Sequence, residues 1–202
     1  MYSSGMIIPV AAERGVRDWS ALTSVAKRER LLDAATEVFA RDGLDAPMSA
    51  VAAAAGAGVA SVYRIVPSKH ELLAALVGRR MDQIADAAAQ AAARPGDRWS
   101  ALTDMLASLV GRQSADDLLG EARVAVADHP DVLARSARAT AAMSALLAAA
   151  RAEGRLRADA TDLDLRLLFA ATRAAKRIEP EHWPRMLELM IDALDADRGR
   201  PA

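Results

Sequence analysis

The sequence predicts an all-α protein of about nine helices, and three observations support this fold class. The chain is rich in alanine, leucine and arginine, which favour helices, whereas the aromatic residues that strands prefer make up only 3%. Apolar residues recur at helical spacing in one segment after another, and no segment alternates apolar and polar residues over the length of a strand. Glycine and proline separate these segments.

The first three helices are expected over residues 27–42, 49–55 and 59–65. In the first, four apolar residues share one face: Leu31, Ala35, Val38 and Phe39. The second consists mainly of alanine, which lets a helix lie close to its neighbours. Gly56-Ala57-Gly58 allows a sharp turn before the third helix. Three helices with a short, glycine-containing connection between the last two predict a helix-turn-helix unit.

The third helix has two different sides. Its apolar side, which we expect to anchor it, consists of Val62 and Ile65, continued by Val66. Its other side carries a hydroxyl, a phenol and a guanidinium, from Ser61, Tyr63 and Arg64. A short helix built in this way can enter the major groove of duplex DNA while its first residues approach the phosphates.

A long helix should connect this unit to a C-terminal helical bundle. It is expected over residues 69–93, with Ser68 as its N-cap and Glu71 as the capping-box partner. The remaining helices are expected from residue 97 or 98, over 115–127, over 131–152, from 161 to Pro180, and over 181–197. We divide the chain into a flexible extension (1–26), a helix-turn-helix domain (27–80), a C-terminal domain (81–197) and a tail (198–202).

Composition excludes several classes of site. The chain has no cysteine, so disulfides, thiolate metal sites and cysteine nucleophiles are ruled out. The three histidines, His70, His129 and His182, lie far apart in the sequence, and we expect no metal site and no cofactor. The sequence has no nucleophile elbow and no phosphate-binding glycine loop, so an enzyme is not expected. No apolar run approaches the length of a membrane span, and the predicted location is the cytoplasm.

Charge is distributed unevenly along the chain. The formal net charge is −1, but residues 27–80 carry eight basic and six acidic residues, whereas residues 81–202 carry sixteen basic and nineteen acidic ones. The basic excess lies in the part expected to form the helix-turn-helix unit. This direction suits contact with a polyanion, although the difference is too small to predict one by itself.

Residues 27–80 resemble the N-terminal domain of the TetR family of bacterial transcriptional regulators. Three stretches carry the resemblance: LLDAATEVFARDG, SAVAAAAG and SVYRIVPSKHELL. The segment AEGRLRADATDLDL and the order of the later helices are also similar, so that the resemblance covers nearly all of the chain after residue 27. Its most specific part is Tyr63 and Lys69 with the Pro-Ser-Lys entry into a long helix.

The resemblance implies double-stranded DNA as the partner and a set of contacts in and after the third helix. Tyr63 and Lys69 would contact phosphates, Arg64 a base edge or a phosphate, and Ser61 either of these weakly. Val59 and Ala60 would offer only apolar contact at the start of the helix. Family members commonly have His-Phe where this chain has Ile65-Val66, a difference that we expect to reduce packing more than function.

The resemblance also implies an effector pocket in the C-terminal bundle. Candidates for its lining are Trp99, Met105, Leu106, Leu109, Met143, Leu147 and Phe169, although we expect most of these to be ordinary core residues. Polar groups to orient a ligand are few, and Arg123, Thr140 and Arg173 can equally be solvated surface residues. The predicted effector is therefore a small, largely apolar molecule.

The last two helices are expected to form a homodimer. Residues 163–175 are apolar around most of the helix circumference, so that two copies pairing as a four-helix interface would bury more of this surface than one. The candidate interface residues are Leu165, Leu168, Thr172, Trp183, Leu187, Met190, Ile191 and Leu194. The alternative is a monomer that buries both helices in its own core.

Together these features predict a ligand-responsive repressor that acts as a homodimer on a palindromic operator. The alternative function is a helical ligand- or protein-binding bundle whose helix-turn-helix unit is degenerate and does not bind DNA.

Overall fold

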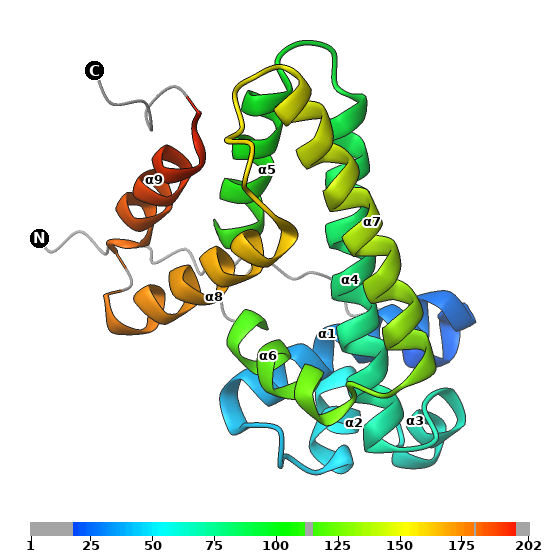
Figure 1. Cartoon of the computed structure of the whole chain (residues 1–202). Coiled ribbons are helices and arrows are strands. Elements are labelled where there is room, and N and C mark those ends of the chain that lie inside the picture. Colours follow the sequence, from blue (N-terminus) through cyan, green and yellow to red (C-terminus); the bar gives the residue numbers. More distant parts are fainter. Residues whose placement is uncertain (1–17, 112–114, 180, 197–202) are drawn as a thin grey trace, which may run out of the picture.

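A computed structural model of the chain describes three stretches of backbone: 18–111, 115–179 and 181–196. Within them, the side chains that remain undescribed are those of residues 115–118, Asp162, Arg173 and Arg177. In chain order the helices of these stretches are the 3-10 helix η1 (Trp19–Ala21) and the α-helices α1 (Ser24–Asp42), α2 (Met48–Ala55), α3 (Val59–Ile65), α4 (Lys69–Ala93), α5 (Arg98–Gly111), α6 (Ala115–Ala125), α7 (Pro130–Ala152), α8 (Asp162–Ile178) and α9 (Trp183–Leu194). The all-α prediction is confirmed (Figure 1).

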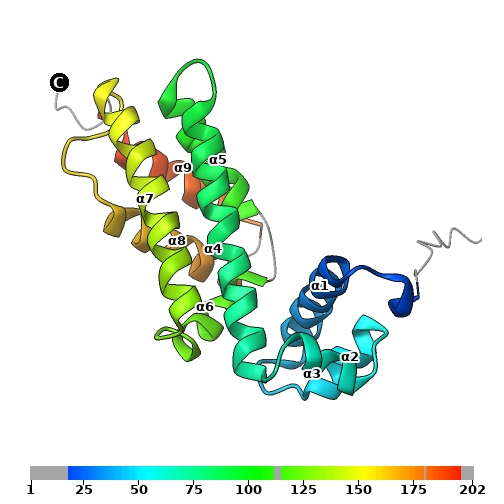
Figure 2. The same cartoon turned by 90° about the vertical axis from the view of Figure 1, so that its right-hand side faces the viewer.

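The helices form two groups that share α4. Figures 1 and 2 show α1, α2 and α3 at one end of the molecule, beside the beginning of α4, while the later helices lie along the rest of it. The most extensive contact between two helices is the one between α4 and α7. Acidic residues of α4 and arginines of α7 form ion pairs along it, including Arg138 Nη1 with Asp82 Oδ1 at 2.8 Å.

The buried side chains also fall into two clusters, and α4 contributes to both. Leu72, Leu76 and Val77 belong to the first cluster with α1, α2 and α3, whereas Ala88 and Ala91 belong to the second with α5, α7 and α8. The first cluster additionally contains three residues from the middle of the chain: Ala122, Val126 and Val132. The core under the helix-turn-helix unit is therefore completed by α6 and the start of α7.

The chain enters the first helix earlier than expected. α1 begins at Ser24, because the hydroxyl of Thr23 accepts a hydrogen bond from the backbone N–H of Ala26 (3.2 Å) and so supplies an N-cap. Before it, the half-buried Trp19 packs against the first core. Residues 18–26 thus belong to the folded part rather than to the extension predicted for 1–26. Residues 1–17 and the predicted tail 198–202 lie outside the described residues.

Two predictions about helix ends are wrong, and tertiary contacts explain both. The last helix ends at Leu194 and not at 197, because the chain there turns to pair with the segment before α8: Arg157 N–H donates to Leu194 C=O (3.0 Å) and Ala196 N–H to Arg155 C=O (2.9 Å). At the start of α4, Ser68 Oγ accepts from Glu71 N–H (3.1 Å) as expected. The carboxylate of Glu71, however, lies beside His129 instead of closing a capping box.

None of the helices in the described stretches is by itself long and apolar enough to cross a membrane. Only α2 and α3 taken together pass such a test of length and composition, and these two are bent by 98° relative to each other. Their apolar residues contribute to the first core.

Candidate nucleic-acid interface

The turn between α2 and α3 sets the direction in which α3 leaves the core. The two helices meet at 98°, within the range of about 90–120° that is typical of helix-turn-helix units. Gly56 ends α2 in the left-handed conformation (φ 67°, ψ 34°), where a side chain is unfavourable. Its N–H donates back to Ala53 C=O at 3.0 Å. Gly58, the N-cap of α3, has φ −72° and ψ 139°, an extended conformation open to any residue.

α3 is anchored along one side and exposed along the other, as its sequence predicts. Val62 is fully buried and Val66 is 2% exposed, and both pack in the first core. On the opposite side Tyr63 is 45% exposed and Val59 42%, which are high values for large apolar or aromatic side chains. The helix itself lies at the end of the molecule that α1, α2 and α3 form (Figure 2).

The predicted contact residues lie on α3 and at the start of α4. Ala60 and Arg64 are exposed, and Ser61 is half-buried. Arg64 Nε donates to Ala60 C=O (3.3 Å), so that the guanidinium lies along its own helix on the solvent side. Lys69, at the first position of α4, is half-buried and its Nζ lies 5.8 Å from the centre of the Phe39 ring.

Polar contacts join α4 to α1 of the helix-turn-helix unit. Arg79 of α4 forms an ion pair with Asp33 of α1 (2.7 Å) and also donates to the Thr36 hydroxyl (3.2 Å). The Arg79 side chain is 23% exposed but that of Asp33 is 69% exposed, so the pair remains open to solvent screening.

One basic residue at this site has no counterpart in the sequence-based prediction. Arg30 of α1 reaches the turn, where its Nη2 lies 2.9 Å from the position that a Cβ on Gly56 would take. Its helical position predicts only a charged face of α1, and the contact depends on how α1 packs across α2. Arg41, by contrast, is engaged by Asp42 (2.7 Å), and this hydrogen bond lowers the pKa of the Asp42 carboxyl below its ordinary value.

The residues predicted to line an effector pocket separate into two sets. A small apolar cavity of about 10 Å³ lies between α5, α8 and α9, and only Leu106 and Phe169 of the predicted residues line it. The other five are core residues of the second cluster: Trp99, Met105, Leu109, Met143 and Leu147. A volume of this size holds about one water molecule, whereas ligand pockets usually measure roughly 300–1,000 Å³.

The residues predicted for dimerisation mostly face the interior of the same chain. Seven of them line that cavity: Leu165, Leu168, Thr172, Leu187, Met190, Ile191 and Leu194. Thr172 is 1% exposed, and its hydroxyl donates to Leu168 C=O (2.8 Å). The eighth, Trp183, packs against α5 and α8: a Cβ added at Gly111 would lie 3.6 Å from a ring carbon, and Lys176 Nζ lies 4.9 Å from the ring centre.

A different set of apolar residues is exposed on α8 and α9. Its members are Leu163, Leu167, Met186 and Leu189, which are between 36% and 58% exposed. Helical periodicity predicts that these residues lie opposite the buried ones. It does not predict which of the two sets is buried, because the sequence of α8 is apolar on nearly all sides. We call these four residues the outer apolar face.

The three polar candidates do not converge on a pocket. Arg123 and Thr140 are exposed, and the side chain of Arg173 lies outside the described residues.

Comparisons with known proteins agree with this geometry. Residues 31–76 match the family described as bacterial regulatory proteins, tetR family. The chain is 34% identical over 97 residues to the HTH-type transcriptional repressor KstR of Mycolicibacterium smegmatis, an alignment that covers 48% of each protein. The chain thus spans about half the length of this curated relative.

Solved structures extend the similarity to most of the fold. A TetR transcription regulatory protein from Mycobacterium vanbaalenii is 29% identical with a TM-score of 0.64, covering 85% of this chain and 96% of that one. A TetR transcriptional regulator from Streptomyces coelicolor is 27% identical with a TM-score of 0.65, covering 83% and 98%. In the matched helix-turn-helix residues and in the arrangement of its helices, this chain is similar to the bacterial regulatory proteins of the tetR family.

Proposed function

We propose that the protein is a transcriptional repressor that binds a palindromic operator as a homodimer and releases it when a small apolar effector binds. The observation that carries the proposal is the two-sided α3, whose buried Val62 holds Tyr63 and Arg64 outward at the end of the molecule. A DNA target places the protein in the cytoplasm.

The exposed side of α3 has the chemistry that a DNA groove requires. A phenol and an ammonium, from Tyr63 and Lys69, can bind phosphate oxygens and fix the register of the helix. Arg64 can donate to a guanine edge or to a phosphate, after giving up its single hydrogen bond to Ala60. Val59 and Ala60 offer apolar contact, which suits a thymine methyl group. These residues give one half of a recognition surface.

A homodimer would supply the second half. The outer apolar face exposes four large side chains on two adjacent helices, and its burial against a second copy would remove them from water. A two-fold pair would present two copies of α3, which is why we expect the operator to be an inverted repeat.

Ligand response would follow from the small cavity between α5, α8 and α9. An effector larger than one water must move these helices apart, and α5 is tied to α4 by the hydrogen bond from Arg80 to Leu109 C=O (3.1 Å). A ligand that binds the opened form better would shift the population toward it, with a coupling free energy typically of about 1–3 kcal/mol. The shifted α4 would change the spacing of the two recognition helices.

Selection of bound duplexes from a random pool tests the DNA function directly. The full chain should enrich an inverted repeat, and its affinity for that repeat should exceed its affinity for a scrambled duplex by at least about a thousandfold. A matched protein with Tyr63→Ala and Arg64→Ala should enrich nothing. Failure of the unaltered chain to enrich any sequence at low salt would overturn the proposal in favour of the helical binding bundle without DNA function.

A further inference from the structure

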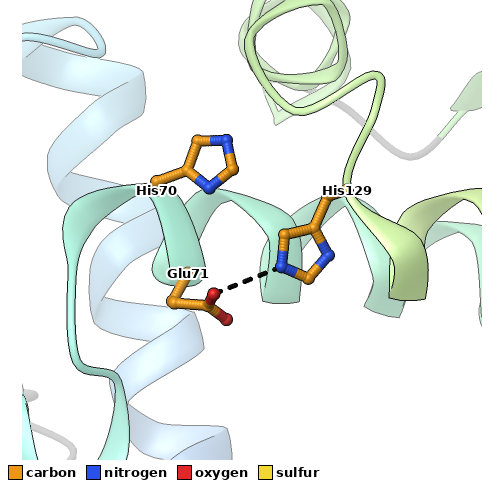
Figure 3. A group of neighbouring side chains, drawn as sticks. All are labelled: His70, Glu71 and His129. Carbon is orange, nitrogen blue, oxygen red and sulfur yellow. Dashed lines mark hydrogen bonds and ion pairs between the residues drawn. The ribbon is translucent and has the colours of Figure 1, made fainter.

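We propose that His70, Glu71 and His129 form a site for a divalent transition metal of the zinc type, between the start of α4 and the start of α7. The three side chains come from two elements far apart in the sequence, the first turn of α4 and the turn between α6 and α7. Figure 3 shows the two imidazoles and the carboxylate gathered at one place. Sequence separation predicts no metal site from the histidines, and the fold brings two of them together.

The distances suit metal coordination. The candidate ligand atoms of the three residues all lie within 4.8 Å of one another, and Nε2 of His129 lies 3.3 Å from Oε1 of Glu71. Zinc ligands at about 2.0–2.1 Å in a tetrahedral arrangement are separated by about 3.3 Å. One edge of the tetrahedron is therefore already formed, and a rotation of the exposed His70 side chain can close the others.

The ring of His129 is fixed so that one nitrogen faces this place. Its side chain is 13% exposed, and its Nδ1 is buried without a hydrogen-bond partner among the described groups. Nε2 is thus the nitrogen available to a ligand from outside. The His70 ring lies beside it, with 5.6 Å between ring centres and a tilt of 47°, which is too inclined for parallel stacking.

The donor set selects the class of ion. Two imidazoles and one carboxylate with a fourth position for water form a common zinc set, whereas magnesium and calcium prefer oxygen ligands only. The N-termini of α4 and α7 disfavour a cation. The carboxylate of Glu71 and the exposed Asp128 and Asp131, which flank His129 in the sequence, supply opposing negative charge.

An ion pair between Glu71 and His129 would explain their contact without a metal, but it would not require His70. The test therefore depends on His70. The purified full chain without a histidine tag is titrated with Co²⁺, whose visible absorption reports tetrahedral nitrogen and oxygen ligands, and Zn²⁺ is then added in competition. We expect one equivalent to bind, and His70→Ala and His129→Asn each to lower the affinity at least about tenfold.

The variants are chosen so that folding is preserved. His70 is exposed, and asparagine is a favourable N-cap at the position of His129. His182→Ala is the matched control, because His182 also lies near a carboxylate, Glu179 (3.7 Å), but has no second imidazole nearby in the described part of the chain. The His182→Ala protein should bind cobalt with the same affinity as the unaltered chain. Mg²⁺ at the same concentration should not compete.

Equal cobalt affinity in the unaltered chain and in His70→Ala would overturn the site, and so would the absence of a tetrahedral spectrum. The titration uses no DNA, so that a chain that binds metal but no operator would contradict the proposed function and leave this inference standing. The reverse result would leave the operator function intact and remove the metal site.

Discussion

At the scale of single residues, the two glycines of the turn before α3 have different tasks. The Gly56-Ala57-Gly58 pattern predicts that both serve the sharp turn, but of these two glycines only Gly56 has a positive φ. Gly58 has an extended backbone, and a Cβ added there would lie 4.0 Å from the hydroxyl oxygen of Ser61. The sequence alone does not distinguish the backbone conformations of Gly56 and Gly58, because the backbone angles depend on how α2 and α3 pack.

The same substitution at both glycines should therefore have opposite effects. Gly56→Ser should lower the free energy of unfolding by about 1 kcal/mol or more, since it forces a side chain into the left-handed region against Arg30. Gly58→Ser should leave it unchanged or raise it by a few tenths of a kcal/mol, since serine is a good N-cap. Urea unfolding followed by circular dichroism measures both. Equal losses would show that the turn is not built as described.

The basic residues at α3 should appear in the salt dependence of DNA binding. Arg64→Ala and Lys69→Ala should each reduce the slope of log affinity against log salt concentration by about one unit if they contact phosphates. Fluorescence anisotropy with the selected duplex at several salt concentrations measures the slope. Arg185→Ala is the control, because Arg185 is an exposed arginine of α9 paired with Glu188 (3.1 Å). A slope that only Arg185→Ala changes would contradict the assignment.

At the scale of elements, most helices could be predicted from apolar periodicity and caps. α3 and α4 have the expected bounds, because glycine, proline and serine mark their ends. The end of α9 could not be predicted, since it depends on pairing with residues before α8. The partner of Glu71 could not be predicted either, because His129 reaches it only through the packing of α6 and α7 on α4.

The capping box of α8 gives a pH-dependent prediction. The Thr161 hydroxyl, and then its backbone N–H, hydrogen-bond to the Asp164 carboxylate and lower the pKa of that group below its ordinary value of 3.8. The folded pKa is the lower one, so the ionised carboxylate stabilises the fold above about pH 4 and this contribution is lost as the pH falls through the folded value.

Thr161→Ala should accordingly cost about 1 kcal/mol of unfolding free energy at pH 7. The difference from the unaltered chain should shrink as the pH falls below the ordinary pKa of aspartate. Urea unfolding at pH 7 and at acidic pH measures this change. Thr140→Ala, at an exposed position within α7, should show neither effect. A cost that stays constant with pH would mean that Asp164 is not stabilised by the cap.

At the scale of the whole molecule, the two faces of α8 differ in their surroundings. One face packs in the core of the chain, and the other is exposed. The apolar composition of this helix predicts that it needs several partners, but not which residues each partner covers. Leu165 and Thr172 are buried against α5 and α9, whereas Leu167 is 58% exposed. The predicted interface residues thus serve mostly the core of one chain, and the outer apolar face is the surface that the proposed dimer would bury.

Leu167→Glu should therefore give a folded monomer. Size-exclusion chromatography with light scattering should show half the mass of the unaltered chain, with an unchanged circular dichroism spectrum. Affinity for the inverted repeat should fall by about 100-fold or more, because each half-site then binds alone. Leu165→Glu, which places a charge at a 3% exposed position, should instead unfold the chain. A dimeric Leu167→Glu protein would exclude this face as the interface.

The first core also constrains how the chain folds during synthesis. Its helices end early in the sequence, but Ala122, Val126 and Val132 cover part of it. Until residue 132 has left the ribosome, the apolar side of the helix-turn-helix unit remains partly open to water, although its own helices are complete. We expect the nascent N-terminal segment to become resistant to protease only when α6 and the beginning of α7 have emerged. The helix-turn-helix unit would then complete its folding only after part of the C-terminal domain has been synthesised.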